Sequence, residues 1–434
     1  MICSFSKSLD FCFREGELTQ VRLRTISLAL FVSSSISLAL SCVVQAQTWG
    51  NPVWSDEFSA TSPGTPPDSS KWTFDTGAKG WGNHELETYC APGSSTPAPC
   101  DSHNPNAFQD GKGHLVIQAI RTSGAPTSVG TWTSARLKTR GLEDFQYGRM
   151  EACMMLPVGA GLWPAFWMLG TTGKWPVGGE IDVMENVPAT GGIGGGLGPT
   201  IVESTISGPS SSAPENIYSL AKDFSFSGGA RVDDTNPSCH VYGIVWSPFM
   251  IQWYVDDWRS PFFISTASDV PAGGRWVANP PNRYYLLLNL AVGGDWPGPP
   301  DASTPSPARV LVDYVRVYRA ERVIGPRMTA SPIGVKAGAS GGAILNLTCD
   351  VGTGRVYLSC SGAPRNATCS LDTGNALNPA AVDFSSSGTQ TAKITVNPGA
   401  AGAEATPPGN YSLTVTAYTV SGDTSTLSIP LTVN

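Results

Sequence analysis

Charged side chains and histidines are scarce in this sequence. Asp, Glu, Lys and Arg make up 14% of the 434 residues, against about 25% in an average soluble domain, and only four residues are His. With 27 basic and 34 acidic residues the net charge is −7, which gives no attraction to nucleic-acid phosphates or to anionic lipid. We therefore expect no nucleic-acid partner and, once the leader described below is removed, no membrane partner.

Patterns typical of long helices are also absent. The 48 Gly and 35 Pro residues interrupt helices, and no amphipathic segment is long enough for a substantial one. Short apolar or β-branched runs instead alternate with Gly, Pro, Asn and Ser clusters from Trp49 to about Ala320, which is typical of an all-β sandwich. The clearest runs are residues 115–120, 149–156, 241–246, 251–255, 284–292 and 310–318.

One long apolar run, residues 26–44, lies near the N-terminus. Arg22 and Arg24 precede it, and a small-residue cleavage site ends at Ala46. This pattern predicts a secretory signal peptide over residues 1–46 and a secreted protein, extracellular or periplasmic. Six serines lower the hydrophobicity of the run below that of a stable membrane span. A retained anchor and a lipid anchor on Cys42 are the alternatives.

Seven cysteines remain after Cys3, Cys12 and Cys42 leave with the signal peptide. Disulfides are the usual state of cysteines in an exported protein. The short loops favour two pairs, Cys90 with Cys100 and Cys360 with Cys369. Cys153 with Cys239 is the third predicted pair, which leaves Cys349 outside the disulfides. No spacing is of the Cys-x-x-Cys type, so we assign no zinc site.

The composition changes after Tyr318. Residues 327–434 contain no Trp, are rich in Thr, Ser, Ala and Val, and end in the strand-like stretches 411–418 and 426–433. We therefore predict two domains after the signal peptide: a catalytic sandwich over residues 47–322 and a smaller β-sandwich over residues 323–434.

The most informative segment is residues 175–186, where Glu180, Asp182 and Glu185 alternate with Ile, Val and Met. On a regular strand Glu180 and Asp182 share one face and Glu185 points to the other. One extra residue, a β-bulge at about Val183 or Met184, returns Glu185 to the face of the other two. All three carboxylates then line one concave surface.

Crowded carboxylates raise one another's pKa, and cleavage of a glycosidic bond uses that coupling. In retaining enzymes an ionised carboxylate attacks the anomeric carbon while a protonated one, about 5 to 5.5 Å away, donates to the leaving oxygen. We predict Glu180 as the nucleophile, Glu185 as the acid and then the base, and Asp182 as the group that bonds Glu180. A calcium loop or a solvated edge strand is the alternative, but the segment lacks the Gly-enabled turn of calcium loops.

The acidic segment resembles the bulged motif of glycoside hydrolase family 16, in its laminarinase-like (endo-β-1,3-glucanase) branch. Further segments similar to the family, in family order, are WSDEF at 54–58, GWGNHELETY at 80–89, GLWPAFWMLG at 161–170, HVYGIVW at 240–246, WYVD at 253–256, NLAVGG at 289–294 and VDYVRVY at 312–318. In the last hundred residues, 356–364 and 407–415 resemble bacterial immunoglobulin-like modules of secreted enzymes. Because that region lacks Trp, we favour a spacer or stabilising role over carbohydrate binding.

The resemblance implies a jelly-roll sandwich with an open, endo-acting cleft and a retaining double displacement. It places the nucleophile at Glu180, the assisting acid at Asp182 and the acid/base at Glu185. The positions that match sugar contacts in the family are Asn83, Glu85, Arg136, Trp163, Trp167 and Trp175. No cofactor serves catalysis. Many members hold a structural calcium on the convex face, and its ligands here would be the backbone oxygens of Glu57 and Gly111 together with Asp313.

Two positions depart from the family pattern. Relatives usually carry Arg in the strand that here contains Cys153, so a charged contact is replaced by a disulfide or a buried thiol. Relatives often carry a cleft His where this chain has Ser207. These changes concern the level of activity and the substrate preference more than the reaction class.

The cleft segments favour an uncharged polysaccharide. Sulfated galactans need cationic contacts, and Arg136 is the only cation assigned to the cleft. We therefore predict a monomeric, secreted endo-β-glucanase that hydrolyses β-1,3-glucan or mixed-linkage β-glucan. The alternatives are a transglycosylase, a hydrolase of an agar-type galactan, and a non-catalytic β-glucan-binding protein. Binding proteins of that kind usually lack the catalytic carboxylates, which this chain retains.

Overall fold

The computed structural model describes most of the chain from Trp49 onward. The described residues are 49–122, 127–188, 197–210, 217–226, 239–247, 250–278, 282–319, 326–336, 338–349, 354–374, 380–384, 388–399, 405–419 and 424–434. The predicted signal peptide, with Cys3, Cys12 and Cys42, lies outside these residues, and so does the predicted domain boundary between 322 and 323. Within the described residues all regular secondary structure is β-strand. No helix long and apolar enough to cross a membrane is found among these residues.

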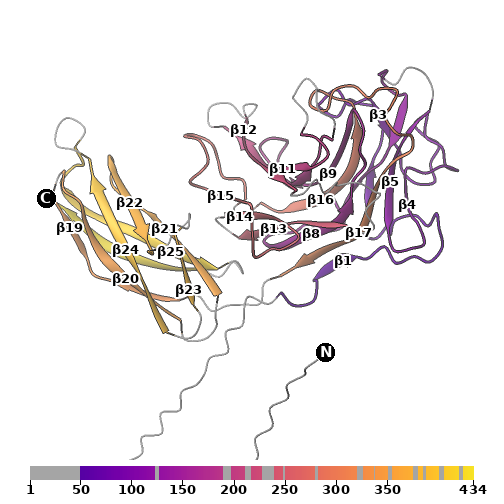
Figure 1. The fold of residues 1–434 in the computed structure, drawn as a ribbon. Coiled ribbons are helices and arrows are strands. Elements are labelled where there is room, and N and C mark those ends of the chain that lie inside the picture. The colour runs from indigo at the N-terminus through magenta and orange to yellow at the C-terminus, as the bar shows by residue number, and fades with distance from the viewer. Residues whose placement is uncertain are drawn as a thin grey trace, which may run out of the picture. The chain divides into compact units, whose positions relative to one another are not determined.

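The larger part of the chain is a sandwich of two sheets (Figure 1). The ten-stranded sheet contains β1 (Trp54–Asp56), β3 (Glu87–Tyr89), β4 (Ala107–Gln109), β5 (Leu115–Arg121), β6 (Trp132–Ser134), β8 (Gly148–Met155), β13 (His240–Ser247), β14 (Met250–Val255), β15 (Phe263–Thr266) and β17 (Ala308–Tyr318). The seven-stranded sheet has the order β12 (Ile217–Ser225), β11 (Ile201–Pro209), β10 (Glu180–Glu185), β9 (Leu162–Gly170), β16 (Tyr284–Val292), β7 (Arg136–Lys138) and β2 (Thr73–Asp75). The predicted all-β, jelly-roll fold class is confirmed.

The core of this sandwich lies between the two sheets. Side chains with period two along the strands meet there, for example Phe166, Ile181 and Leu288 from the seven-stranded sheet and Ile244 and Val315 from the other. Each of these five side chains is fully buried. Their burial supplies the apolar driving force that sets which face of each strand points inward, and so which face is left for a cleft.

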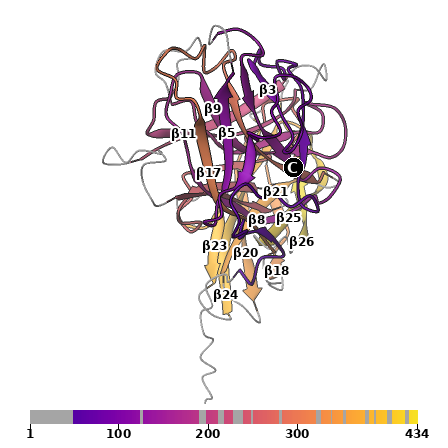
Figure 2. The same ribbon diagram turned by 90° about the vertical axis from the view of Figure 1, so that its right-hand side faces the viewer.

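A second β-sandwich follows from residue 327 (Figure 2). One sheet contains β18 (Arg327–Ala330), β20 (Gly341–Cys349), β22 (Ala367–Asp372) and β24 (Gly388–Pro398). The other contains β19 (Ile333–Val335), β21 (Gly354–Ser361), β23 (Ala381–Phe384), β25 (Gly409–Thr419) and β26 (Thr424–Val433). Both sheets contribute to its own core, which includes Leu345, Ile394, Leu413 and Ile429. The expectation of additional β-structure after the composition change is confirmed.

The three predicted disulfides are all present. Cys90 is bonded to Cys100, Cys153 to Cys239 and Cys360 to Cys369. Cys349 is buried and lies outside the disulfides, as expected. Cys153 is therefore half of a disulfide and not a buried thiol, which settles the alternative left open by the sequence.

The longest of these cross-links leads to a prediction on stability. The Cys153–Cys239 bond closes a separation of 86 residues and the Cys90–Cys100 bond one of 10. Chain entropy gives about 4.6 kcal/mol for the first and about 2.7 kcal/mol for the second. We expect Cys153→Ala/Cys239→Ala to lower the urea midpoint more than Cys90→Ala/Cys100→Ala. An equal or smaller loss for the long loop would contradict this expectation.

Candidate active site

A β-bulge interrupts strand β10. Glu180 and Asp182 lie opposite Ser207 and Thr205 of β11, but the next paired residue, Glu185, lies opposite Glu203. Three residues of β10 therefore span two residues of β11, and the register with β9 shifts at the same place. Because directly opposed residues of antiparallel strands share a face, Glu185 lies on the face of Glu180 and Asp182. The bulge predicted from the spacing of the acids is confirmed.

Buried hydrogen bonds hold the bulge. The indole nitrogen Nε1 of Trp253 reaches across from the ten-stranded sheet and donates to the carbonyl of Asp182 at 2.9 Å. The hydroxyl of Ser204 donates to the carbonyl of Val183 at 2.8 Å. Both donors are buried, so the bonds replace the sheet hydrogen bonds that an extra residue disrupts.

Gly179 directly precedes strand β10 in a conformation that suits glycine. Its φ is +83°, and an added Cβ would lie 2.3 Å from the hydroxyl of Tyr284 and 2.5 Å from Cβ of Val277. Only a residue without a side chain fits this turn. The turn therefore sets where Glu180 enters the sheet.

All nine residues predicted for catalysis and sugar contact line one cleft of about 310 Å³, on the face of the seven-stranded sheet away from the core. The full lining is Trp81, Gly82, Asn83, Glu85, Arg136, Trp163, Ala165, Trp167, Leu169, Trp175, Glu180, Asp182, Glu185, Asn289 and Ala291. A trough over the three acids, which the interpretation requires, is therefore present. Its aromatic walls and convergent polar groups are typical of a small-molecule or sugar site.

Trp163 contacts the carboxylate that was predicted as the acid/base. Its indole Nε1 donates to Oε1 of Glu185 at 3.0 Å, and its ring packs edge-on against Trp296 at 5.4 Å. Trp163 therefore orients Glu185 as well as lining the cleft. The sequence predicted the sugar-facing ring but not this hydrogen bond, since it depends on the bulge.

A hydrogen-bonded chain runs from Trp167 to Glu85. Trp167 Nε1 donates to Asn289 Oδ1 at 2.7 Å, and the Asn289 amide donates to the hydroxyl of Tyr89 at 3.2 Å. That hydroxyl donates to Glu85 Oε2 at 3.1 Å, and Asn83 donates to the other oxygen of Glu85 at 3.2 Å. The chain fixes the orientation of polar groups along one half of the cleft.

Arg136 lies between two indole rings. Its guanidinium is 4.6 Å from the ring centre of Trp167 and 5.3 Å from that of Trp81, and Nε is 3.1 Å from an oxygen of Asp75. Stacking and the ion pair hold this cation in place. Trp81 and Asn289 were not predicted as site residues, although both belong to segments quoted for the family resemblance.

Burial raises the pKa of all three acids, and the charges of neighbouring acids raise those of Asp182 and Glu185 further. Burial, opposed by a hydrogen bond from Trp175 and the charge of Arg136, raises the pKa of Glu180 to about 7. Burial, then the charges of Glu180 and Glu185, raise the pKa of Asp182 well above its usual range. Burial, then the charges of Glu180 and of Glu203 on β11, raise the pKa of Glu185 to about 8.

These directions assign different protonation states at neutral pH. The hydrogen bond between Asp182 and Glu180 lowers the pKa of Glu180 and raises that of Asp182. The proton therefore sits on Asp182, and Glu180 is the carboxylate that ionises first. Glu185 keeps its proton to a higher pH than Glu180. One ionised and one protonated carboxyl group on a single face can act as a nucleophile and an acid.

Ser207 occupies the position where a cleft His was expected from the resemblance. It lies directly opposite Glu180, is buried, and its hydroxyl is 2.8 Å from that of Ser219 on β12. This serine pair lies next to Glu180 in the sheet and carries no charge. No imidazole is available at this position to act on Glu180.

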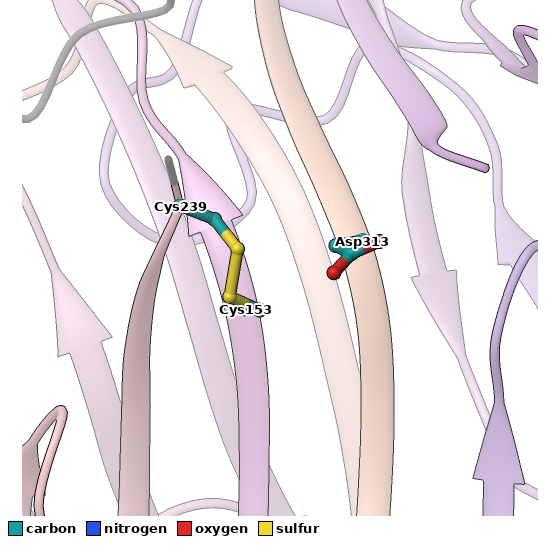
Figure 3. A group of neighbouring side chains, drawn as sticks. All are labelled: Cys153, Cys239 and Asp313. Atoms are coloured by element: carbon teal, nitrogen blue, oxygen red, sulfur yellow. A yellow bond between two sulfur atoms is a disulfide. The ribbon is translucent and has the colours of Figure 1, made fainter. Parts of the chain in front are cut away.

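The predicted calcium ligands lie on the ten-stranded sheet and its loops. Asp313 is the extra residue of a second bulge, between Val312 and Tyr314 of β17. Figure 3 shows its carboxylate beside the Cys153–Cys239 disulfide. One carboxylate oxygen of Asp313 and the two sulfur atoms lie within 4.8 Å of one another. Sulfurs bonded to each other are not thiolates and do not ligate a metal, so Asp313 alone of this group can contribute.

The other two predicted ligands, Glu57 and Gly111, belong to loops that follow strands β1 and β4 of the same sheet. Glu57 follows β1, whose last residue, Asp56, pairs with Val315 of β17. The side chain of Glu57 is bonded to Arg316, which lowers its pKa and leaves only its backbone oxygen for a metal. Gly111 has φ +77° and packs against the backbone of Thr61 and Pro63, in the loop that follows Glu57.

Comparison with known proteins places this site in a family. Residues 100–301 match the model of glycosyl hydrolases family 16. The chain is 38% identical over 277 residues to a β-glucanase of Rhodothermus marinus, a match that covers 62% of this chain and 84% of that protein. It is 35% identical over 296 residues to glucan endo-1,3-β-glucosidase A1 of Niallia circulans, covering 62% of this chain and 38% of that longer protein.

A solved structure agrees with these matches. The endo-β-1,3-glucanase of Pyrococcus furiosus superimposes with a TM-score of 0.51 and 36% sequence identity, over 63% of this chain and 96% of that one. The matched 63% of the chain is similar in length to the larger sandwich. Together with the 38% identity over most of a β-glucanase, it shows that the chain is a glycoside hydrolase and belongs to glycosyl hydrolases family 16.

Proposed function

We propose that this protein is a secreted, retaining endo-β-glucanase that hydrolyses β-1,3-glucan or mixed-linkage β-glucan. The observation that carries the proposal is the bulge in β10, which turns Glu180, Asp182 and Glu185 toward one cleft. The relatives described above are named as β-glucanase, glucan endo-1,3-β-glucosidase and endo-β-1,3-glucanase, which supports the class of substrate.

In the first step Glu180 attacks the anomeric carbon and Glu185 gives its proton to the departing glycosidic oxygen. The bond to that oxygen breaks, and a covalent glycosyl ester forms on Glu180. Asp182, protonated and bonded to Glu180, disperses the negative charge of the nucleophile until attack. Trp163 holds Glu185 by its indole N–H, so the acid faces the cleft when the sugar arrives.

In the second step water resolves the intermediate. Glu185, now ionised, takes a proton from the water as its oxygen attacks the anomeric carbon, and Glu180 leaves as a carboxylate. Each step inverts the anomeric carbon, so the product keeps the β-configuration. A sugar hydroxyl in place of water would give transglycosylation by the same residues.

The charge of the cleft favours a neutral glucan. Among the described residues that line it, Arg136 is the only cation, and it is already engaged by Asp75 and two indole rings. The described part of the cleft therefore offers no free cation to pair with sulfate or carboxylate groups on a substrate, and an ionised Glu180 would repel them. Trp175, with 54% of its surface exposed, offers an open face for a sugar ring.

Export is proposed from the leader and the disulfides. The apolar run after Arg24 ends in a cleavage site, and three disulfides need an oxidising compartment. We propose a monomeric protein, with the C-terminal sandwich acting as an immunoglobulin-like spacer.

A structural calcium ion is proposed at Asp313 and the backbone oxygens of Glu57 and Gly111. The fit rests on the Asp313 carboxylate, which is half-buried and makes no hydrogen bond or ion pair with the described residues. A partly desolvated carboxylate together with backbone carbonyl oxygens is a ligand type that suits calcium. The ion would join β17 to the loops after β1 and β4 and takes no part in catalysis.

The substrate class is tested by measuring reducing ends released from laminarin, mixed-linkage β-glucan and agarose. We expect release from the two glucans and none from agarose, because the cleft is matched to neutral glucose chains. Release from agarose alone would refute the glucan assignment. Binding of laminarin without release of reducing ends would identify a binding protein instead.

The roles of the two glutamates are separated by azide rescue on an activated aryl β-glucoside. Without azide, Glu185→Ala should lose about 10²- to 10⁴-fold in turnover of laminarin, and Glu180→Ala more. With azide, Glu185→Ala should form the β-glycosyl azide and Glu180→Ala the α-anomer, read by NMR. The exposed Glu143→Ala is the control and should match the wild type. The same anomer from both variants would exclude the assigned roles.

Removal of calcium should lower the thermal stability of the protein but not its catalytic activity. We expect a chelator to reduce the melting temperature of the wild type, with recovery when calcium is restored, because the ion binds only the folded state. The Asp313→Asn variant should melt lower than the wild type and respond less to the chelator. A melting temperature that is unchanged by chelator, with no calcium found by elemental analysis, would dismiss the site.

A further inference from the structure

A row of acidic residues continues from the catalytic trio toward the edge of the sheet. Glu185 of β10 lies opposite Glu203 of β11, and Glu203 lies opposite Asp223 of the edge strand β12. Directly opposed residues on antiparallel strands share a face, with Cβ atoms about 4.5 to 5.5 Å apart. Glu203 and Asp223 therefore lie on the cleft side of the sheet, on the side of Glu185 away from β9 and Trp163.

The alternation of side chains along β11 and β12 agrees with this placement of Glu203 and Asp223 on the cleft side of the sheet. Val202, Ser204 and Ile206 of β11 are buried, and Ser204 bonds the bulge from the core side. Glu203, between them, is half-buried and points the other way. On β12 Lys222 pairs with Ser204 and so belongs to the opposite face from Asp223. The pairing thus supplies no cation to neutralise this acidic pair on the cleft face.

Glu203 and Asp223 act on each other. Burial, then the charge of Asp223 and a hydrogen bond with it, raise the pKa of Glu203 to about 7. Glu203 is therefore mainly ionised above about pH 7, which is where Glu185, with its pKa raised to about 8, approaches the loss of its proton.

We infer that Glu203 is a positioning residue for the proposed reaction: its carboxylate, beside Glu185 in the row that ends at Asp223, keeps the proton on the acid/base until the leaving group arrives. The inference rests on the proposed function and adds a residue outside the acidic motif. Glu203 acts through Glu185 and does not need to touch substrate.

The other groups that face Glu185 can be named. Glu180 and Asp182 share its strand, β9 contributes the uncharged indole of Trp163, and β11 contributes Glu203. The charge of Arg136, from β7, acts on Glu180. After Glu180 becomes an ester it has no charge, and Glu203 is then the ionisable neighbour of Glu185 contributed from another strand. It therefore favours return of a proton to Glu185 at the end of the cycle.

The sign of the effect follows directly. A negative neighbour favours the neutral form of Glu185, so removing that charge lowers the pKa of Glu185. We expect Glu203→Gln to move the alkaline limb of kcat/KM on laminarin to lower pH by about half a unit to one unit. The acidic limb should move less, because Glu180 lies farther along the strand from Glu203.

Asp223→Asn is the matched control. It removes one negative charge, as Glu203→Gln does, but one strand farther from Glu185. Losing Asp223 lowers the pKa of Glu203 and leaves it more ionised, so the alkaline limb should stay in place or move to higher pH. The exposed Glu143→Gln should leave both limbs unchanged. Equal downward shifts for Glu203→Gln and Asp223→Asn would mean a general charge effect and overturn the inference.

A readout independent of turnover separates this inference from the proposed function. In protein labelled with ¹³C at Glu carboxyl carbons, the Glu185 resonance should titrate at lower pH in Glu203→Gln than in the wild type. An unchanged titration overturns the inference even if laminarin is hydrolysed. A wild type inactive on every glucan would refute the proposed function, and the titration would still decide the role of Glu203.

Discussion

The site depends on one extra residue between Asp182 and Glu185. Without it, Glu185 would follow Ile181 and Val183 toward the apolar core, and Met184 would face the cleft. Burying an unpaired carboxylate in that core is costly, so the apolar residues and the acids favour the same bulged register. The indole of Trp253 and the hydroxyl of Ser204 hold the two carbonyls that the bulge exposes. The core of the sandwich and the chemistry of the cleft are thus specified together.

The same register determines the electrostatics. Burial raises the pKa of all three carboxyl groups, and neighbouring charges and hydrogen bonds then act differently on each of them. Arg136 and Trp175 favour ionisation of Glu180, whereas Glu203 favours the neutral form of Glu185. The difference between two chemically identical side chains therefore comes from what the adjacent strands place beside them. That difference is what an enzyme needs to use one as a nucleophile and the other as an acid.

Much of this could be predicted from the sequence because the signals are local. The odd spacing of Glu185 predicts the bulge, and short loops predict two of the disulfides. Interactions across strands could not be predicted, because they depend on register between distant segments. The bond from Trp163 to Glu185, the chain from Trp167 through Asn289 to Glu85, and the pairing of Glu203 with Glu185 are of this kind. The calcium ligands, the signal peptide and the residue roles remain predictions.

The most direct test of the account is to identify the residue that becomes bonded to the sugar. A 2-deoxy-2-fluoro glucoside with an activated leaving group slows both steps and lets the glycosyl ester accumulate, so that peptide mass spectrometry can locate it. The account predicts a single labelled peptide with the sugar on Glu180, and no label in Glu180→Gln. A label on Glu185, or inactivation without any covalent adduct, would contradict the arrangement proposed for the three acids.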